Sequence, residues 1–539
     1  MISHIQLAVL LMLGAATCAV AGVGTGAPVP LAAHETFLPK FIGEGPNGSD
    51  NGAIQPCTGV QAGAPAVICV RAGAPGGGTG SAAMPFATIN AAIAAAKAGD
   101  IVQVAAGTYT ENVALGTFTA PSSTNLTLLG GFAVGFATRN AAANRSIVDG
   151  GQVDPAVQLH VDSNQTTTLD GFEITGGLGL GTTFEDGNGY GGGVYAVQYG
   201  DGTMVISHND VHDNRTRSHI TEDTRGGGIH AHTQSFGGAT ATMRVEDNHV
   251  HDNIAGKGAG INVTGRQASL VRNRVENNTT HNDHGGGIYV STASTDVRNN
   301  LIRGNVVGAS VGYGWGAGIL VAGASADLQR NLITGNYTPT AGSGVFWDEG
   351  AVGTMRNDLI VRNRCPAENR PAAAIYVDGG SGPSIVMLEN VTVADHVCPG
   401  AESGDAAVVI EDGSMIAVKN AIFWGNTRDF ATVSGGSYAI TYSITQENGT
   451  GNVNVDPLFF NATALDYHVR SAAGRYTPGG WVNDAQTSPA IDAGDPASSF
   501  AQETQPNGGR VNLGAFGNTP EASRSPGGPA DFIFASSFE

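Results

Sequence analysis

The segment NDVHDN at residues 209–214 sets the pattern of this chain, because altered copies of it return further along the sequence. Each copy begins and ends with Asn and carries Val or Ile at its third position. Repeats of a few tens of residues are typical of solenoids, in which equivalent residues of successive coils stack into columns. The next four copies are NHVHDN at 248–253, NRVENN at 273–278, NLIRGN at 300–305 and NLITGN at 331–336.

Aligning the copies gives two columns of asparagine. Stacked amides can hydrogen-bond along a column, and Asn tolerates the left-handed backbone of tight turns. The branched residues between them, such as Val211 and Val250, would fill the interior. The first column comprises Asn209, Asn248, Asn273, Asn300, Asn331 and Asn390, with Asp358 standing in once, and the second comprises Asn214, Asn253, Asn278, Asn305, Asn336, Asn363 and Asp395.

A third column is a triplet of small residues followed by Val or Ile, and glycine suits the tight corners of a coil. The spacing between triplets varies, as expected when loops change length while strands keep register. Because parallel crossovers are strongly right-handed, we expect an all-β, right-handed parallel β-helix solenoid. The triplets end at Gly193, Gly228, Gly260, Gly287, Gly318 and Gly344.

The composition fits this architecture and disfavours some partners. Of 539 residues, 80 are glycine and 41% are hydrophobic, which favours many short strands separated by turns. The formal net charge of −20 lacks the basic footprint that phosphate recognition needs, so we expect no nucleic-acid partner. No segment has the ~20 apolar residues of a transmembrane helix, and we expect a monomer.

The N-terminus has the features of an export signal. Residues 5–16 form an apolar run, and Ala19, Val20 and Ala21 provide a small-residue cleavage pattern. We therefore expect a signal peptide over residues 1–21 and a protein that is secreted or held at the cell surface.

Four cysteines, Cys57, Cys69, Cys365 and Cys398, remain after the expected cleavage. An even number in an oxidising compartment predicts two disulfides. Cys57 and Cys69 would close a local loop. Cys365 and Cys398 each precede Pro at matching places in successive repeats, and coils stacked ~4.8 Å apart allow a disulfide. The alternative for the second pair is two separate thiols.

Both ends of the repeat region carry segments that suit the closing of a solenoid. PFATINAAIAAAKA at residues 85–98 predicts a capping helix that begins at Thr88. The longer stretch 84–113 resembles the entry segment of secreted bacterial right-handed β-helix proteins of the pectate-lyase-like superfamily. The closing segment of the same group resembles VDPLFFN at 455–461, DYHVRS at 466–471, SPAIDAGDPASSF at 488–500 and PNGGRVNLGAFGNTPEAS at 506–523.

This resemblance implies an architecture rather than one activity, since the group includes polysaccharide lyases, hydrolases, epimerases and many surface proteins. The last residues, DFIFASSFE, resemble a short tail of exported proteobacterial proteins and are either a sorting signal or a frayed end. The expected divisions are a signal peptide at 1–21, an N-terminal segment at 22–80, the β-helix at 81–470, a C-terminal capping segment at 471–525 and a tail at 526–539.

The residue just before each triplet gives the first candidate site. Arg225, Lys257 and His284 occupy this position in three consecutive coils, with Tyr190 before them and Trp315 after them. At ~4.8 Å per coil the five residues would span ~19 Å, the length of a few sugar units. We refer to these five residues as the basic column.

Another column lies two residues after each triplet. If the preceding Val or Ile faces inward, alternation along the strand points this column outward, where aromatic rings can stack on sugars. The alternative is that long loops cover these residues or that they form ordinary stacked ladders. The column reads Tyr195, His230, Asn262, Tyr289, Leu320, Phe346 and Tyr376.

These columns favour an extracellular polysaccharide or cell-surface glycan as the ligand. Among enzymes, β-elimination of a uronate is favoured, with Lys257 or His284 as the base and Arg225 neutralising the carboxylate. Tyr190 and Trp315 would hold flanking sugars. The alternative is that these side chains are simply solvated. Further candidates for substrate binding are Asp223, His230, Asp283 and Tyr289.

Other functions remain open, because no strong catalytic motif is present and the sequence does not decide whether the chain is an enzyme. A glycoside hydrolase needs two opposed carboxylates, which Glu222, Asp223 and Asp283 offer. A noncatalytic adhesion or structural protein would use the long face for contact alone.

Metal binding is a further candidate function. His212, His251 and Glu276 share one column, three residues after the first asparagine, and their types suit a divalent ion. A divalent cation such as calcium is therefore a candidate cofactor, and an outward-facing, solvated ladder is the alternative.

Overall fold

The computed structural model confirms the expected parallel β-helix. Within the residues it describes, the strands of the coils pair in parallel with their equivalents in the next coil, and helical structure is confined to the α-helix α2 (Ile89–Ala95) and a short 3-10 helix. The chain forms two compact units, which are described separately below. The structure describes residues 54–63, 65–179, 189–217, 224–234, 240–281, 283–308, 314–364, 374–396 and 406–527.

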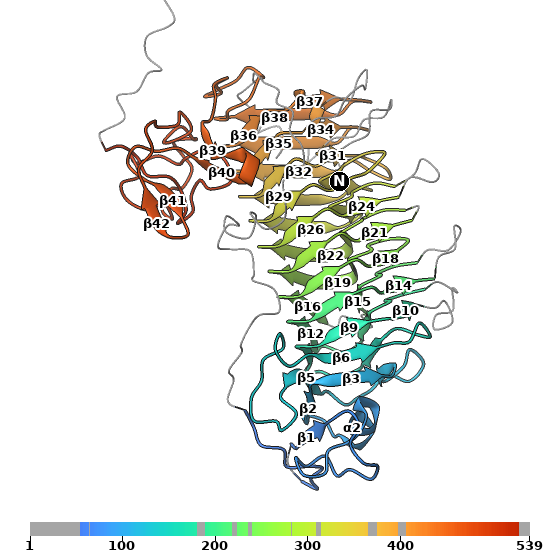
Figure 1. Ribbon diagram of the computed structural model, residues 1–539. Coiled ribbons are helices and arrows are strands. Elements are labelled where there is room, and N and C mark those ends of the chain that lie inside the picture. The colour runs from blue at the N-terminus through green and yellow to red at the C-terminus, as the bar shows by residue number, and fades with distance from the viewer. Residues whose placement is uncertain are drawn as a thin grey trace, which may run out of the picture. The chain divides into compact units, whose positions relative to one another are not determined.

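The first unit comprises Ile42–Asp327 and Thr334–Ala351, and three parallel ladders of strands run through it (Figure 1). The β1 ladder comprises β1 (Val67–Val70), β2 (Ile101–Ala105), β5 (Thr127–Phe132), β8 (Thr166–Asp170), β12 (Thr203–Ser207) and β16 (Thr242–Glu246). The β3 ladder comprises β3 (Gly107–Thr110), β6 (Ser146–Asp149), β9 (Glu173–Thr175), β13 (Asp210–His212), β17 (His249–His251), β20 (Arg274–Glu276) and β23 (Leu301–Arg303). The β4 ladder comprises β4 (Val113–Leu115), β7 (Val157–Val161), β11 (Val194–Gln198), β15 (Ile229–Thr233), β19 (Ile261–Val271), β22 (Ile288–Arg298), β25 (Ile319–Ala322) and β28 (Val345–Asp348).

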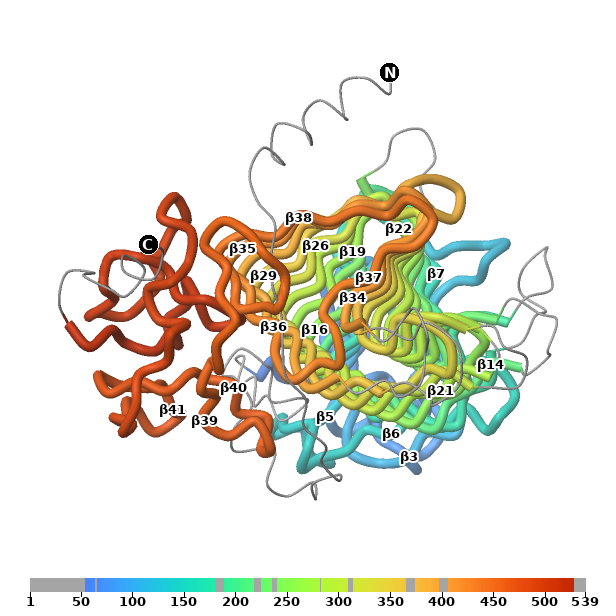
Figure 2. The backbone as a smooth tube through the Cα atoms, turned by 90° about the horizontal axis from the view of Figure 1, so that it is seen from above, coloured from blue at the N-terminus to red at the C-terminus, as the bar shows by residue number. Residues whose placement is uncertain are grey.

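Successive coils of the first unit superimpose when viewed along the stack (Figure 2). The long strands β19 and β22 also extend the β1 ladder through their second halves. In the coils from β9 to β23, a short fourth ladder follows the β3 ladder and precedes the β4-ladder strand of the next coil. Its strands are β10 (Leu178–Gly179), β14 (Arg215–Thr216), β18 (Ile254–Ala255), β21 (Thr279–Thr280) and β24 (Val306–Val307).

The interior is built from the predicted columns. Val211, Val250, Val275 and Ile302 are fully buried and pair with one another in register. The asparagines beside them are buried too, and the side-chain amides of Asn209, Asn248 and Asn273 each donate to the amide oxygen of the equivalent asparagine in the next coil. Asn253 likewise donates to Oδ1 of Asn278 over 3.0 Å.

The left-handed backbone does not occur where we expected it in these coils. The ladder asparagines of the first unit keep negative φ, and the residue just before each of them turns left-handed. His208 and Asp213 have φ of 53°, and Asp252 has φ of 54°. The asparagine instead contributes its amide, which bridges coils.

The N-terminal cap was correctly predicted. Thr88 Oγ1 accepts a hydrogen bond from Ala91 N, and Ile89 and Ala92 are buried beneath α2. Cys57 and Cys69 form the expected disulfide, with their Cα atoms 5.8 Å apart. Because β1 pairs in parallel register with β2, the parallel structure begins at Val67. Cys365 and Cys398 lie outside the described residues.

The second unit comprises Leu328–Ile333 and the chain from Val352 onward, and it repeats the same parallel pairing. Its strands are β29 (Val352–Arg356), β30 (Leu359–Val361), β31 (Ile375–Val377), β32 (Ile385–Glu389), β33 (Thr392–Ala394), β34 (Ala406–Ile410), β35 (Met415–Lys419), β36 (Ile422–Trp424), β37 (Arg428–Thr432) and β38 (Ser437–Thr441).

The predicted closing segments complete the second unit. The first two of them contain β39 (Phe459–Asn461) and β40 (Asp466–Val469), which pair antiparallel, and a second antiparallel pair, β41 (Arg475–Thr477) with β42 (Gly480–Val482), lies between the second and the third. Val469, Ala490 and Leu513 pack with Ile422 and Ile444 of the last coils. These segments therefore lie against the outer side of the ladder of β30, β33 and β36, where Thr392 Oγ1 accepts a hydrogen bond from Ala515 N over 2.9 Å.

Candidate functional site

The predicted basic column forms a ladder in the first unit. Tyr190 pairs in parallel with Arg225, and Arg225 pairs with Lys257. The backbone continues the stack: Gly258 N donates to His284 O over 3.0 Å and Gly285 N donates to Trp315 O over 2.8 Å. The five positions therefore follow one another from coil to coil as the alignment predicted.

The carboxylate of Asp283 and the ring of Trp315 contact the basic residues in the middle of this column. Lys257 Nζ lies 3.6 Å from Asp283 Oδ2, and His284 Nε2 lies 2.9 Å from Asp283 Oδ1. The His284 ring stacks on Trp315 with centroids 4.4 Å apart, and Trp315 N donates to His284 Nδ1. Lys257 and His284 thus share one carboxylate, and both are only partly exposed.

The outward aromatic column is buried, so its expected exposure was wrong. His230 is 3% exposed and Tyr289 is 9% exposed, which removes both from the accessible surface. The reason lies in the turn before each strand: a Cβ on the left-handed Gly226 would lie 2.7 Å from His230 Cβ. The turn therefore folds back over the column, which only a glycine without a Cβ permits.

An open pocket of about 440 Å³ lies beside the β4 ladder. It is formed by the turns that follow β4, β7, β11 and β15, where the chain passes toward the β1 ladder. Two aromatic side chains line it together with carboxylates and amides, and no described lining residue is cationic. The lining comprises Phe118, Pro121, Asp162, Asn164, Tyr199, Gly200, Asp201 and Gln234.

Hydrogen bonds hold the polar rim of this pocket. Asn164 Oδ1 accepts from Asp201 N over 3.1 Å, and the Tyr199 hydroxyl lies 3.2 Å from His160 Nδ1. His232 Nε2 lies 2.9 Å from Gln234 Oε1. Burial lowers the pKa of His160 to about 4 and raises that of Tyr199 to about 12. Both groups are therefore neutral at physiological pH.

His232 connects the pocket to the basic column. Burial lowers its pKa, and the nearby positive charge of Arg225 lowers it further. The basic column precedes the starts of the β4-ladder strands and the pocket follows their ends, so the two flank the same ladder.

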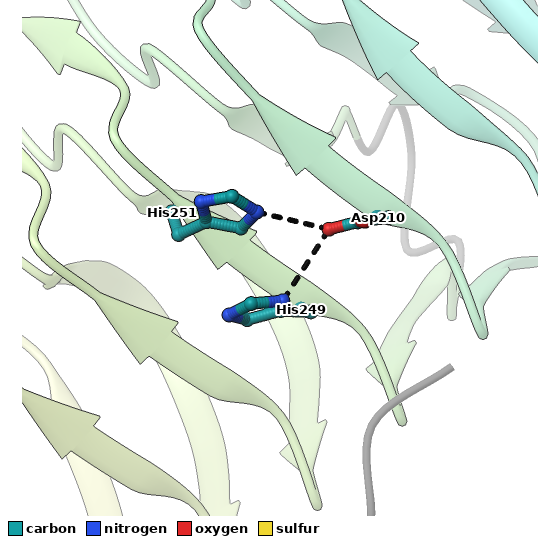
Figure 3. Close-up of side chains that lie close together, drawn as sticks. All are labelled: Asp210, His249 and His251. Carbon is teal, nitrogen blue, oxygen red and sulfur yellow. Dashed lines mark hydrogen bonds and ion pairs between the residues drawn. The ribbon is translucent and has the colours of Figure 1, made fainter. Parts of the chain in front are cut away.

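A second group of titratable side chains lies on the outer face of the β3 ladder. The predicted column of His212, His251 and Glu276 is in register there. Asp210 and His249, which the sequence analysis did not select, lie beside this column. Asp210, His249 and His251 each place one possible ligand atom close to the other two (Figure 3). The available signal was strand alternation, because residues two apart share a face.

The remaining candidates have different outcomes. Asp283 contacts Lys257 and His284, as described above, whereas Asp223 and Glu222 lie outside the described residues. The pocket residues were not predicted from sequence, because they lie in turns of unequal length that carry no periodic signal. No helix among the described residues is long and apolar enough to cross a membrane.

Comparisons with known proteins found the following similarities. Residues 180–376 match the family described as periplasmic copper-binding protein (NosD), and residues 405–494 match the family described as disaggregatase related. The crystal structure of pectate lyase Pel9A is similar over 84% of this chain and 96% of that chain, at 14% identity and a TM-score of 0.37. No curated protein matches the chain. With its parallel ladders, this chain is a right-handed parallel β-helix protein.

Proposed function

We propose that this chain is an exported β-helix protein that binds an extracellular polysaccharide on the β4-ladder face of the first unit. The observation that carries the proposal is the open pocket, where Phe118 and Tyr199 lie among carboxylates and amides. Aromatic rings offer an apolar surface to a sugar ring, and a few fixed polar groups orient its hydroxyls.

The charges of the pocket and of the basic column indicate which kind of sugar each would bind. Asp162 and Asp201 give the pocket acceptors for the hydroxyls of a neutral sugar, and they would repel a uronate. Arg225 and Lys257 of the basic column would attract a carboxylate instead. A polysaccharide with both neutral and acidic residues would match the two parts together.

The test is calorimetric titration of the full chain with neutral and uronate-containing polysaccharides. Tyr199→Ala and Phe118→Ala should each weaken binding about tenfold, equivalent to ~1.4 kcal/mol. Tyr199→Phe should retain most of it, and Val153→Ser, a change at an exposed residue outside the pocket, serves as the control. Absence of binding, or equal binding by Tyr199→Ala and Val153→Ser, would overturn the proposal.

β-Elimination is the second candidate, and the in-register basic column is the observation that favours it. Lys257 or His284 would remove the proton beside a uronate carboxylate that Arg225 neutralises. The released electron pair would form a carbon–carbon double bond as the glycosidic oxygen leaves. The shared contact with Asp283 means that substrate must displace this carboxylate first.

Unsaturated sugar ends, followed by ultraviolet absorbance on a uronate polymer, distinguish a lyase from a binding protein. With Lys257 as the base, Lys257→Ala should abolish their formation, whereas activity that survives this change would assign the base to His284. Lys97→Ala, at an exposed residue just after α2, is the control and should change nothing. New reducing ends without unsaturation would indicate a hydrolase. Binding without either product would leave a noncatalytic adhesion protein.

A further inference from the structure

We infer that Asp210, His249 and His251 form a binding site for a divalent transition-metal ion. The three residues lie on β13 and β17, where Asp210 pairs in register with His249. Val250 between the two histidines is buried in the interior, so alternation along the strand places both imidazoles on the outer face. Figure 3 shows the carboxylate and the two rings turned toward one another.

The separations between the ligand atoms fit a small ion. Asp210 Oδ1 lies 3.3 Å from His249 Nδ1 and 3.0 Å from His251 Nε2. All three ligand atoms lie within 4.8 Å of one another. A tetrahedral ion with bonds of ~2.0–2.1 Å separates neighbouring ligands by ~3.3 Å, so an ion fits with small side-chain shifts.

The nitrogens on the far side of the two rings supply a second, independent observation. His251 Nδ1 lies 2.6 Å from Asp252 Oδ2, and His249 Nε2 lies 3.1 Å from Glu276 Oε2. A carboxylate that accepts the proton of one ring nitrogen leaves the other nitrogen's lone pair for a metal, and it fixes the orientation of the ring. Both histidines therefore have the outer partner that metal-binding histidines use.

The donor set identifies the class of ion. Two imidazoles and one carboxylate suit zinc, nickel or copper, whereas calcium prefers oxygen ligands alone. Among divalent first-row ions, copper binds such sites most tightly. The side chains of Asp210, His249 and His251 are 30%, 25% and 21% exposed, which leaves a path for the ion and room for a water ligand.

The preceding coil shows why the site forms only once on these strands. Its equivalents of Asp210, His249 and His251 are Glu173, Asp210 and His212. That coil therefore offers one imidazole instead of two, and Arg145 forms an ion pair with its Glu173. His212 also stacks on His251, with ring centroids 5.0 Å apart, but it supplies none of the three ligand atoms. It is therefore a matched control for a histidine that only packs against the site.

The test is titration of the chelator-stripped full chain with Cu²⁺ and Zn²⁺, followed by calorimetry and, for Cu²⁺, by electron paramagnetic resonance. One ion per chain should bind at this site, with hyperfine coupling to two imidazole nitrogens. His249→Asn and His251→Asn should each weaken this binding by about 100-fold, and His212→Asn should leave it unchanged. Glu276→Gln, which only positions His249, should weaken it about tenfold.

Two results would overturn the inference. One is the absence of an imidazole-bound ion in the wild-type chain, and the other is equal binding by His251→Asn and His212→Asn. Circular dichroism establishes whether each variant is folded. If the ligand variants do not fold, the resonance spectrum of the wild-type chain decides alone: two nitrogen ligands support the site and oxygen-only ligation contradicts it.

Discussion

His160 and His232 on the β4 ladder, and His249 and His251 on the β3 ladder, are histidines of one unit, and burial acts on the pKa of each. Their pKa values nevertheless move in opposite directions. Burial lowers the pKa of His160 to about 4 and also lowers that of His232. Burial acts the same way on His251, but hydrogen bonds to Asp210 and Asp252 outweigh it and raise its pKa to about 9.

The difference shows that the coil above or below decides how a histidine behaves in this fold. His160 contacts the hydroxyl of Tyr199, and its Nε2 has no hydrogen-bond partner among the described residues. His249 contacts Asp210 from the coil before it and Glu276 from the coil after it. The pocket side is therefore neutral at its histidines, whereas the β3 ladder carries paired charges when no metal is bound.

The largest effect should follow from removing the carboxylate at the centre of this charged group. Burial alone would raise the pKa of Glu276, but His249, Arg303 and Arg274 outweigh it and lower the pKa to about 2. Glu276→Gln leaves these cations without their shared partner, so we expect a loss of about 4 kcal/mol in unfolding free energy at pH 7.

Urea unfolding of the chelator-treated protein, with hydrogen exchange of the β20 region, measures this loss. The stabilisation by Glu276 is complete above pH 4.5 and disappears as pH falls toward 2, because its pKa is lower in the folded chain. Glu246→Gln, at a partly exposed residue of β16, is the control. A penalty that stays constant down to pH 2 would mean that charge is not its cause.

Asp210→Asn should remove most of the upward shift in the pKa of His251. Without the shared carboxylate, the pKa of His251 should fall toward its ordinary value, and we expect a loss of about 3 kcal/mol at pH 6. Because the pKa is raised in the folded chain, the stabilisation is complete below pH 6.5 and lost as pH rises through about 9.

Histidine titration by nuclear magnetic resonance in the presence of a chelator measures this change directly. Asp213→Asn, which removes the neighbouring carboxylate from His212, is the matched control. An unchanged pKa of His251 in Asp210→Asn would assign the shift to Asp252 instead.

The sequence predicted columns well and lateral contacts poorly. Asn209, Asn248 and Asn273 repeat at equivalent places, so their stacking follows from alignment alone. The contact between Asp210 and His251 is diagonal, since it joins neighbouring columns in successive coils, and alignment does not show it. The covering of His230 depends on the left-handed turn at Gly226, which is a property of backbone geometry rather than of the repeat.

The pocket was not predicted for a different reason. Phe118 and Tyr199 lie in turns, and a turn's position depends on its own length and hydrogen bonds rather than on a period. Once the register of β7 and β11 is known, however, their turns must lie side by side. A sequence analysis that aligned the residues after each strand would have brought Asp162 and Tyr199 together.

Asp358 is a buried carboxylate whose pKa, unlike that of Glu276, is not lowered by a neighbouring positive charge. It replaces Asn in the first column of the second unit, where Asn331 N and Nδ2 both donate to its Oδ1 over 2.8 Å. Burial raises its pKa to about 7. Asp358→Asn should therefore stabilise the chain by about 2 kcal/mol at pH 8.

The sign follows from the raised pKa: the folded chain holds the proton more tightly, so stability falls as pH rises from about 4 to 7. The gain from Asp358→Asn should therefore shrink toward pH 4. Thermal unfolding at pH 4 and pH 8 measures it, with Asp327→Asn as the control. Destabilisation at pH 8 would show that the carboxylate has a partner that Asn cannot replace.

The smallest effect at neutral pH should come from His160→Phe, which tests the neutral side of the comparison. Phe keeps the edge contact with Tyr195 but loses the hydrogen bond to Tyr199, so we expect a loss of about 1 kcal/mol at pH 7.5. The lowered pKa of His160 means that the wild-type chain loses stability as pH falls from 6.5 to about 4. Phe does not titrate, so the two stability curves should cross in this range. Tyr199→Phe removes the same hydrogen bond and keeps the imidazole, so its curve should stay parallel to the wild type; parallel curves for both variants would mean that the acid sensitivity arises elsewhere.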